Sequence, residues 1–320
     1  MTSGPRRARV DALAKINLGL RVLNKRPDGF HELRTVYQTI SLADALEIEF
    51  TPARRTSIEL VSTPEIPDNL VLRAARLAMD AMRATGRVMF RLRKRIPMGA
   101  GLGGGSSDAA AALLALPALA GRRIPLEELI RLAGELGSDV PLFLLGGTVL
   151  GVGRGSEVYP LADMPRARGL LVVPPIQVST AEAYRALGRE LTNEAAPNMI
   201  SSFQSCIWRS MVGVSEEGFP ALAGNDFEQA VFRHYPQLRS IKAKLQRLGA
   251  APAMLTGSGS ALYGMFRERG RLEQALPHFH KMGAYPFVFV SRTGYRARWR
   301  RRLGAHAFEE IWPPQSRDAS

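Results

Sequence analysis

The chain has 320 residues, of which 46% are hydrophobic and 22% are charged, and its formal net charge is +14. This composition is typical of a globular protein with two domains of ordinary size, and it excludes a disordered or fibrous chain. Pro252 and four glycines interrupt the longest uncharged run, residues 248–266, so this run cannot form an apolar helix across a bilayer.

The first sixty residues are rich in predicted strands. Runs with many β-branched residues at 33–40, 45–50 and 57–61 are separated by turn residues such as those of the Arg26–Gly29 segment. Charged residues from Asp11 onward interrupt any sustained apolar stretch, which argues against a secretory signal. We therefore expect the chain to begin with a sheet.

A helix, a strand and a glycine-rich loop are expected next. Apolar residues at helical spacing after the capping residues Asp68 and Asn69 predict a helix over about 69–85. A strand is expected at 88–92, and a second helix is expected to begin at about Ser106 because alanine and leucine dominate the following sequence. The order is therefore strand, glycine loop, helix.

The glycine-rich loop is predicted to bind phosphate. Glycine lets backbone N–H groups approach an anion closely, and the N–H groups and dipole of the following helix add positive potential there. A flexible linker is the weaker alternative, because a linker does not run directly into a helix rich in alanine and leucine. The glycines and serines of this loop are Gly99, Gly101, Gly103, Gly104, Gly105, Ser106 and Ser107.

Three familiar phosphate-binding patterns do not fit this loop. The Gly99–Gly104 spacing matches the dinucleotide pattern, but no convincing βαβ unit with a ribose-binding acid accompanies it. No Gly-Lys-Ser or Gly-Lys-Thr ends the cluster, and neither His-Arg-Asp nor Asp-Phe-Gly occurs, which excludes the P-loop and the protein-kinase set. A different nucleotide-binding fold is implied.

Three further polar groups are candidate site residues. Lys15 and Asn17 share one face of an apolar strand, where they line a site or the wet side of an edge strand. Phe30 and His31 place an aromatic ring beside an imidazole, which suits a planar base but also an ordinary turn. Asp139 stands before an apolar segment, as a functional carboxylate or as a turn residue.

The second half predicts an α+β sandwich that begins after a proline-bearing boundary at 160–168. A second glycine motif, Thr256–Gly259, lies between two predicted strands and is either a binding loop or a tight turn. Residues 192–224 show little periodicity and are expected to form a long loop or short irregular helices. Helices are predicted at 180–190, 225–235, 238–248 and 272–280, and strands at 169–173, 253–256, 261–266 and 286–290.

Cysteine content and the position of the charge bear on compartment and partners. The single cysteine, Cys206, excludes an internal disulfide and a multi-cysteine zinc site, which indicates a cytoplasmic location. Six arginines lie within residues 292–302, interleaved with Tyr295 and Trp299. Such a segment suits nucleic acid, but we favour a solvated basic tail because charge runs at chain ends are usually solvated.

The motifs together resemble the GHMP kinase superfamily. The Ala14–Asn17 segment is similar to its first motif, the 99–107 loop to its second and the Thr256–Gly259 segment to its third. The resemblance implies a two-domain α+β fold, with the active site between an N-terminal domain of ribosomal-protein-type domain 2-like fold and a C-terminal ferredoxin-like sandwich. The expected boundaries are 1–162 and 163–291 for these domains and 292–320 for the basic tail.

Within the superfamily, five segments are similar to those of kinases that act on a cytidine diphosphate derivative of methylerythritol. These segments are 15–18, 28–31, 68–70, the triple glycine with its two serines at 103–107, and 138–141. The resemblance implies phosphoryl transfer from ATP, with Mg²⁺ bridging the nucleotide phosphates and no protein ligand of the metal identified. One departure is Phe30, where the family usually has tyrosine, so stacking is expected to survive while a hydroxyl contact is lost.

The resemblance also implies roles for individual residues. Asp139 is expected to accept the hydroxyl proton of the substrate while Lys15 orients that hydroxyl. The nucleotide is expected on the glycine–serine loop together with Asn69, Lys94 and Pro97. Cytosine is expected between Phe30, His31 and Tyr184, with further substrate contacts from Asn17, Thr180, Gly257, Ser258 and Gly259.

The expected partner is a small-molecule substrate, without nucleic acid or membrane, and a homodimer is a possibility. Two alternatives to the kinase of this specificity remain open. Another small-molecule kinase of the superfamily would share the loops without needing the Phe30–His31 pair. A nucleic-acid-binding protein of related fold would need neither Lys15 nor Asp139.

Overall fold

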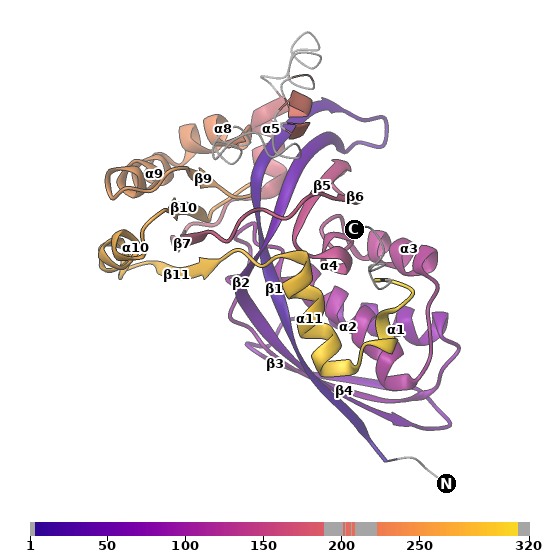
Figure 1. Ribbon diagram of the computed structural model, residues 1–320. Helices are drawn as coiled ribbons and strands as arrows, with labels where there is room; N and C mark the ends of the chain where they lie inside the picture. The colour runs from indigo at the N-terminus through magenta and orange to yellow at the C-terminus, as the bar shows by residue number, and fades with distance from the viewer. Residues whose placement is uncertain (1–3, 189–200, 202, 206, 209–222, 313–320) are drawn as a thin grey trace, which may run out of the picture.

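The computed structural model describes residues 4–188, 201, 203–205, 207–208 and 223–312. Two long strands, β1 (Arg6–Lys25) and β2 (His31–Pro52), run through the middle of the molecule. In Figure 1 helices of the first half of the chain lie on one side of this pair and most elements of the second half lie on the other. Most of the segment predicted at 192–224 lies outside the described residues, as does Cys206.

The first sheet contains seven strands among the described residues, with β1 and β2 at its centre. Its order is β3-β4-β2-β1-β8, and β5 pairs with both β2 and β6. The antiparallel β1–β2 register shifts between Leu13 and Lys15 and again between Asn17 and Gly19. Such irregularities re-aim side chains, and here they flank the two polar residues of the strand. The remaining strands of this sheet are β3 (Ser57–Thr63), β4 (Gly86–Arg93), β5 (Thr148–Gly153), β6 (Glu157–Pro160) and β8 (Gly224–Asn225).

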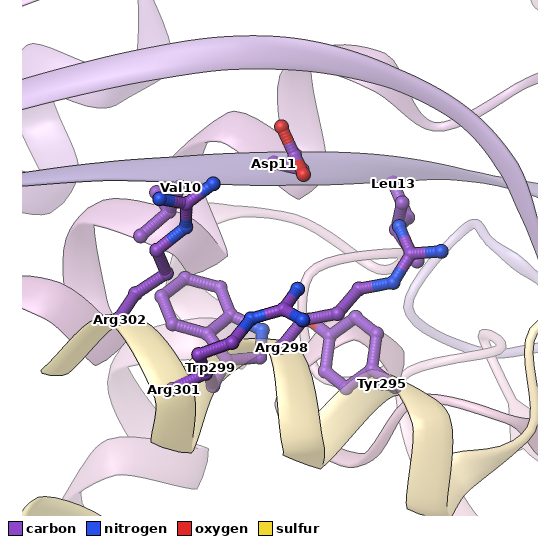
Figure 2. A pocket seen from close by; sticks show the side chains of 8 residues that line it. All are labelled: Val10, Asp11, Leu13, Tyr295, Arg298, Trp299, Arg301 and Arg302. Atoms are coloured by element: carbon purple, nitrogen blue, oxygen red, sulfur yellow. The ribbon is translucent and has the colours of Figure 1, made fainter. Parts of the chain in front are cut away.

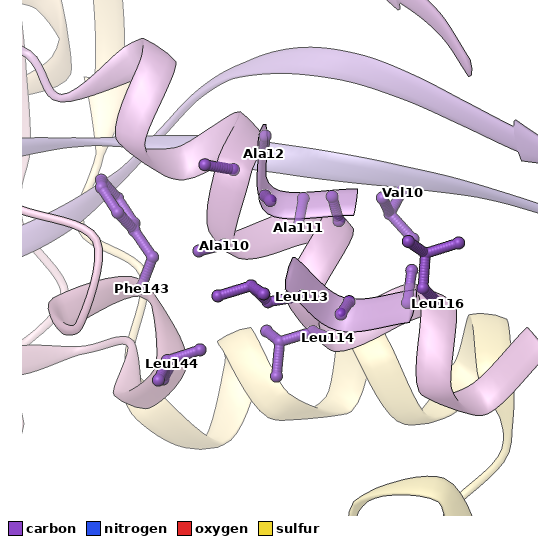
Figure 3. Close-up of a cluster of buried hydrophobic side chains, with 14 of the residues drawn as sticks. Val10, Ala12, Ala110, Ala111, Leu113, Leu114, Leu116, Phe143 and Leu144 are labelled. Atoms are coloured by element: carbon purple, nitrogen blue, oxygen red, sulfur yellow. The ribbon is translucent and has the colours of Figure 1, made fainter. Parts of the chain in front are cut away.

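Helices from the first half pack on the first sheet. Helix α2 is buried along the whole of residues 107–116, because alanine and leucine fill every side and the helix lies between the sheet and its neighbours. Figure 3 shows Leu113 and Leu114 in one cluster with Phe143 and Leu144. The helices are α1 (Leu70–Ala81), α2 (Gly104–Ala120), α3 (Leu126–Leu136) and α4 (Leu142–Leu145).

The second sheet has four antiparallel strands in the order β11-β7-β10-β9. Counted in chain order this is 4-1-3-2, which is the ferredoxin-like arrangement that was expected for this half. The strands are β7 (Arg168–Val173), β9 (Ala253–Leu255), β10 (Leu262–Phe266) and β11 (Gly283–Val288). The accompanying helices are α5 (Thr180–Gly188), α8 (Phe227–His234), α9 (Pro236–Arg247) and α10 (Arg269–Ala275), followed by the short 3₁₀ helix η1 (Leu276–Phe279).

The interpretation of residues 292–320 as a solvated basic tail is wrong for residues 292–312. Residues Arg292–Leu303 form helix α11, and His306–Phe308 form a 3₁₀ turn, η2. Tyr295 and Trp299 lie four residues apart, so they share one face of α11, and both are buried together with Phe308 and Trp312. Figure 2 shows the two rings between α11 and β1, with the arginines around them. Residues 313–320 lie outside the described residues.

Two other expectations differ in detail. The helix predicted at 272–280 ends at Ala275 and continues as η1, whose second residue is Pro277. Proline lacks the N–H group that an α-helix needs at that point. Strands β5 and β6 were not predicted, because the glycines of residues 146–155 look like loop sequence. Among the described residues, no helix has the length and apolarity needed to span a membrane.

Candidate active site

Two glycine-rich loops from opposite halves of the chain touch one another. The backbone of Gly101 lies so close to the turn between β9 and β10 that a Cβ atom on Gly101 would be 2.4 Å from the carbonyl oxygen of Thr256. A Cβ atom on Gly257 would in turn lie 3.3 Å from the Cα of Gly101. The N–H of Ala261 also donates to the carbonyl oxygen of Ala100. The contact closes one side of a cleft lined by β1, β2, the two loops and helix α5 (Thr180–Gly188).

The first glycine-rich loop, residues 99–107, ends in the first turn of helix α2. Gly103, with φ +69°, is the residue before the helix, which begins at Gly104, two residues earlier than predicted. The free N–H groups of this first turn therefore belong to the loop itself. A cavity of about 370 Å³ lies over the loop. Among its lining residues are Asn69, Lys94, Pro97, Gly99, Gly101, Gly103, Gly104, Gly105 and Ser106.

Two of the residues expected at the nucleotide play internal roles. Ser107 is buried and does not line the cavity. The Oδ1 atom of Asn69 accepts from the N–H of Val71, so Asn69 caps helix α1 as well as lining the cavity. The loop and the cap of α1 thus form two walls of one cavity.

Lys94 is held by two buried carboxylates. Its Nζ donates to Asp44 and, over 2.7 Å, to Asp108, and its side chain is only 5% exposed. Burial opposes the charged form, but the two carboxylates outweigh it and raise the pKa of Lys94. Burial also raises the pKa of Asp108 to about 7, with Asp44 adding to the effect. Lys94, which directly follows β4, therefore links β2 to α2 behind the loop. Its ammonium group is bound to the carboxylates of Asp44 and Asp108.

Lys15 and Asp139 form an ion pair at the centre of the cleft. The Lys15 Nζ lies 3.3 Å from Asp139 Oδ2 and donates to Asn17 Oδ1 over 3.0 Å. Lys15 is buried, whereas the Asp139 side chain is 30% exposed. Tyr37 donates from its hydroxyl to Asp139 Oδ1 over 3.3 Å. Burial, followed by the charge of Asp139, raises the pKa of Tyr37 well above its ordinary value, so this hydroxyl stays a donor.

The aromatic residues line the same cleft as the ion pair, and the cleft has a volume of about 990 Å³. The rings of His31 and Tyr184 are stacked at 4.8 Å and 19°, and Tyr184 meets Phe227 edge-on. Phe30 is exposed, and the guanidinium of Arg154 lies 4.7 Å from the centre of its ring. Burial, followed by the charge of Lys25, lowers the pKa of His31, so its imidazole is neutral at pH 7.

The third motif joins the cleft to β1. Asn17 Oδ1 accepts from the N–H of Gly257 over 3.0 Å, and the N–H of Asn17 donates to Thr256 Oγ1. Ser258 and Thr180 share a hydrogen bond of 2.9 Å between their hydroxyl groups, and both line the cleft. Gly259 is not part of the lining and instead supports the turn, donating its N–H to the carbonyl oxygen of Thr256.

Several residues of the site were not predicted from the sequence. Tyr37 is paired with Asn17 across the β1–β2 ladder, so strand register, which needs the fold, brings it to the cleft. The side-chain amide of Asn225 bridges the carbonyl oxygens of Leu255 and Gly257. The signal for Asn225 was its position at the start of the helix predicted over 225–235, where asparagine often caps.

The cleft contains oxygen donors of the kind that Mg²⁺ prefers. The hydroxyl of Ser106 and the carboxylate of Asp139 line the same cavity. Within the described ranges, no group of three or more histidine, cysteine or acidic side chains is placed to hold a metal ion. Because Mg²⁺ is usually held by one or two protein oxygens together with nucleotide phosphates, these residues fit a magnesium ion that arrives with the nucleotide.

Two family models match the chain. The model for the GHMP kinases N-terminal domain matches residues 69–147, and the model for the GHMP kinases C-terminal domain matches residues 215–284. A 4-diphosphocytidyl-2-C-methyl-D-erythritol kinase from Solibacter usitatus (strain Ellin6076) is 58% identical over 98% of this chain and 99% of its own length. The enzyme of the same name from Pelotomaculum thermopropionicum is 39% identical over 88% of this chain and 96% of its own length.

Solved structures agree with these matches. A crystal structure of 4-(cytidine 5′-diphospho)-2C-methyl-D-erythritol kinase has a TM-score of 0.72 and 35% identity, and covers 88% of this chain and 98% of its own. A homoserine kinase from Cytophaga hutchinsonii has the same TM-score at 17% identity over 91% of this chain and 96% of its own, which shows the fold alone. Fold and motifs thus define a small-molecule kinase. The chain belongs to the GHMP kinase family, among the 4-diphosphocytidyl-2-C-methyl-D-erythritol kinases.

Proposed function

We propose that the protein transfers the γ-phosphoryl group of ATP to the 2-hydroxyl of 4-diphosphocytidyl-2-C-methyl-D-erythritol, a step of non-mevalonate isoprenoid synthesis. The observation that carries this proposal is the Lys15–Asp139 ion pair, which lies in one cleft with the glycine-rich loop and an aromatic pocket. The names of the relatives point to the same substrate.

Asp139 acts as the general base for the attacking hydroxyl. Its side chain is partly exposed to the cleft, while Lys15 and Tyr37 hold its two oxygens in place. The substrate oxygen bonds to the γ-phosphorus, the bond from phosphorus to the ADP oxygen breaks, and the hydroxyl proton moves to the Asp139 carboxylate. General bases placed in this way typically contribute about 10²–10⁴-fold to the rate.

Charge on the transferring group is stabilised from two directions. The N–H groups at the start of α2 point out of the helix end over which the phosphate cavity lies. Lys15 supplies a fixed positive charge beside the attacking oxygen, in a buried position where electrostatic interactions are stronger than in water. A bound Mg²⁺ would neutralise phosphate charge here, held by Ser106 and the nucleotide itself.

The aromatic end of the cleft suits the cytosine ring. His31, Tyr184 and Phe30 line the same cavity as the proposed catalytic pair, where Tyr184 stacks on the imidazole of His31 and Phe30 is exposed. The neutral imidazole of His31 offers one donor and one acceptor to the edge of a base. Residue 30 is phenylalanine where the family usually has tyrosine, so its ring can stack on a base but has no hydroxyl group. The guanidinium of Arg154 lies over part of this ring.

An ATP-consumption assay with four acceptors tests this proposal. We expect turnover with the cytidine diphosphate derivative of methylerythritol and none above background with homoserine, mevalonate or galactose. Turnover of one of the other three would instead assign the chain to another small-molecule kinase of the superfamily. Absence of turnover with all four, together with binding to RNA or DNA, would favour the nucleic-acid alternative.

A further inference from the structure

The last described segment of the chain returns from the second half and packs against the first. Helix α11 lies beside α4 and α2 in Figure 1, beyond the end of the matched C-terminal family model at residue 284. In Figure 3, Leu114 and Leu144 lie on the side of the core cluster that faces α11. The segment therefore contacts the part of the kinase body that follows Asp139.

Two side chains of this segment bind the carbonyl groups at the end of helix α4. The hydroxyl of Tyr295 donates to the carbonyl oxygen of Phe143, and Trp312 Nε1 donates to that of Leu144 over 2.8 Å. A helix of four residues cannot satisfy these last carbonyls internally. The two donors and the two carbonyl groups belong to residues that are all buried, namely Tyr295, Trp312, Phe143 and Leu144. Water therefore does not replace the two donors.

Two glycines make room for this contact. A Cβ atom on Gly146 would lie 2.3 Å from the Tyr295 ring, and one on Gly147 would lie 2.6 Å from the N–H nitrogen of Arg292. The Arg292 guanidinium donates to the carbonyl oxygens of Thr148 and Leu161, and its backbone N–H donates to Asp163. The loop that follows α4 is thus built to receive α11.

Helix α4 is joined to Asp139 by consecutive hydrogen-bonded turns. The N–H of Val140 donates to the carbonyl of Gly137, and the N–H of Phe143 donates to that of Val140. The Phe143 ring also contacts the glycine-rich loop at 99–107, because a Cβ atom on Gly103 would be 3.1 Å from both this ring and the Lys15 side chain. A shift of α4 therefore moves Asp139 and the packing beside Lys15 together.

We infer that Tyr295 and Trp312 are positioning residues, which hold Asp139 at its working distance from Lys15 by fixing the carbonyl end of α4. This inference rests on the proposed function, since it concerns the residue that takes the proton. Arg300 supports Trp312 by donating to its carbonyl oxygen, whereas three other arginines of α11 face elsewhere. In Figure 2 the side chains of Arg298, Arg301 and Arg302 extend from α11 toward β1.

The full-length variants Tyr295→Phe and Trp312→Phe test the inference, because each keeps a buried ring and removes one donor. We expect kcat to fall roughly 10- to 100-fold in the double variant, the range for small misplacements far from the reacting atoms, with both KM values unchanged. The control is Phe308→Leu, which loosens packing against Trp299 and Trp312 and leaves both donors in place. Its kcat should stay near that of the wild type, measured well below its Tm.

A second measurement separates positioning from general weakening. In an Asp139→Asn background, single-turnover phosphoryl transfer should not decrease further when Tyr295→Phe and Trp312→Phe are added, since they act through Asp139. Hydrogen exchange at residues 140–146 should be faster in the double variant than in Phe308→Leu. Unchanged kcat, an equal loss in the Phe308 control, or a full additional loss in the Asp139→Asn background would each overturn the inference. Failure of the proposed function is seen separately, as inactivity of the wild-type protein.

Discussion

Lys15 is almost completely buried, and an ammonium ion in such a place needs partners that offset its desolvation. It has three: the carboxylate of Asp139, the amide oxygen of Asn17 and the ring of Tyr37, 5.3 Å from its Nζ. Asn17 in turn donates to Thr35 and accepts from the glycine turn of the second half. One residue, Asn17, thus links Lys15 to the glycine turn of the second half.

Substitution of the catalytic pair should affect the chemical step more than binding. Asp139→Asn keeps the size of the side chain but removes the base, so kcat should fall by about 10²–10⁴. Lys15→Met should also lower kcat, because the positive charge beside the developing alkoxide is lost. The double variant should be less than additive, since both residues act on one hydroxyl proton. Single-turnover rates and substrate Kd values measure this, and near-wild-type turnover of Asp139→Asn would exclude it as the base.

The buried Lys94 group should give the protein a characteristic pH dependence. The carboxylates of Asp44 and Asp108 share the Lys94 ammonium, and among the described residues the Oδ1 atom of Asp108 has no hydrogen-bond partner. Burial raises the pKa of Asp108 to about 7. The folded state therefore binds a proton that the unfolded state releases between about pH 4 and pH 7. The contribution of Asp108 to stability must then decrease as the pH rises through this window.

The variant Asp108→Asn makes this dependence measurable. Urea unfolding of wild type and variant between pH 4 and pH 8 should show the wild type losing stability relative to the variant as the pH rises, with no further relative change above about pH 7.5. Glu128→Gln, on an exposed part of α3, is a control that should leave this window unchanged. Parallel stability curves for the wild type and Asp108→Asn would show that Asp108 keeps the same protonation in both states.

Among the secondary-structure elements, those with a distinctive pattern in consecutive residues were predicted from the sequence. The glycine run followed by alanine and leucine predicted a loop that runs into a buried helix, and the apolar spacing after Asn69 predicted α1. The site also needs contacts that no local pattern contains, such as the β1–β2 register that places Tyr37 opposite Asn17. The resemblance to a known family supplied the residues of the cleft that local patterns left ambiguous.

The contact between the two glycine-rich loops predicts a strong effect at Gly101. Its φ of +80° is strained for a residue with a Cβ atom, and that atom would meet the carbonyl oxygen of Thr256 at 2.4 Å. Gly101→Ala should therefore displace both loops at a cost of about 1–3 kcal/mol or more, raising KM for ATP and for the acceptor together. Gly134→Ala in α3, where the added atom meets nothing within 4 Å, is the matched control. Equal kinetics in both variants would contradict a tight contact between the loops.

At the scale of the whole molecule, the two halves are interlocked rather than simply joined. Strand β8 from the second half pairs with β1 in the first sheet, and α11 then crosses back to cover α2 and α4. The packing of α11 on the first half could not be predicted from charge, because six arginines and only two aromatic residues lie within 292–302. The rings decide where the helix packs, since each buries a large apolar area. Arg301 and Arg302 stay exposed, whereas the Arg292 guanidinium donates to carbonyl oxygens of the first half.

Removal of residues 292–320 should consequently destroy the folded enzyme. Burial of Tyr295, Trp299, Phe308 and Trp312 contributes about 1.5–3 kcal/mol each, a total comparable with the 5–15 kcal/mol that usually separates folded from unfolded domains. The truncated chain should be insoluble or show no cooperative thermal transition, whereas removal of residues 313–320 alone keeps every described contact and should leave Tm within a few degrees. A soluble truncated chain with wild-type kcat would contradict both this prediction and the positioning role of the segment, because neither donor to α4 would then be needed.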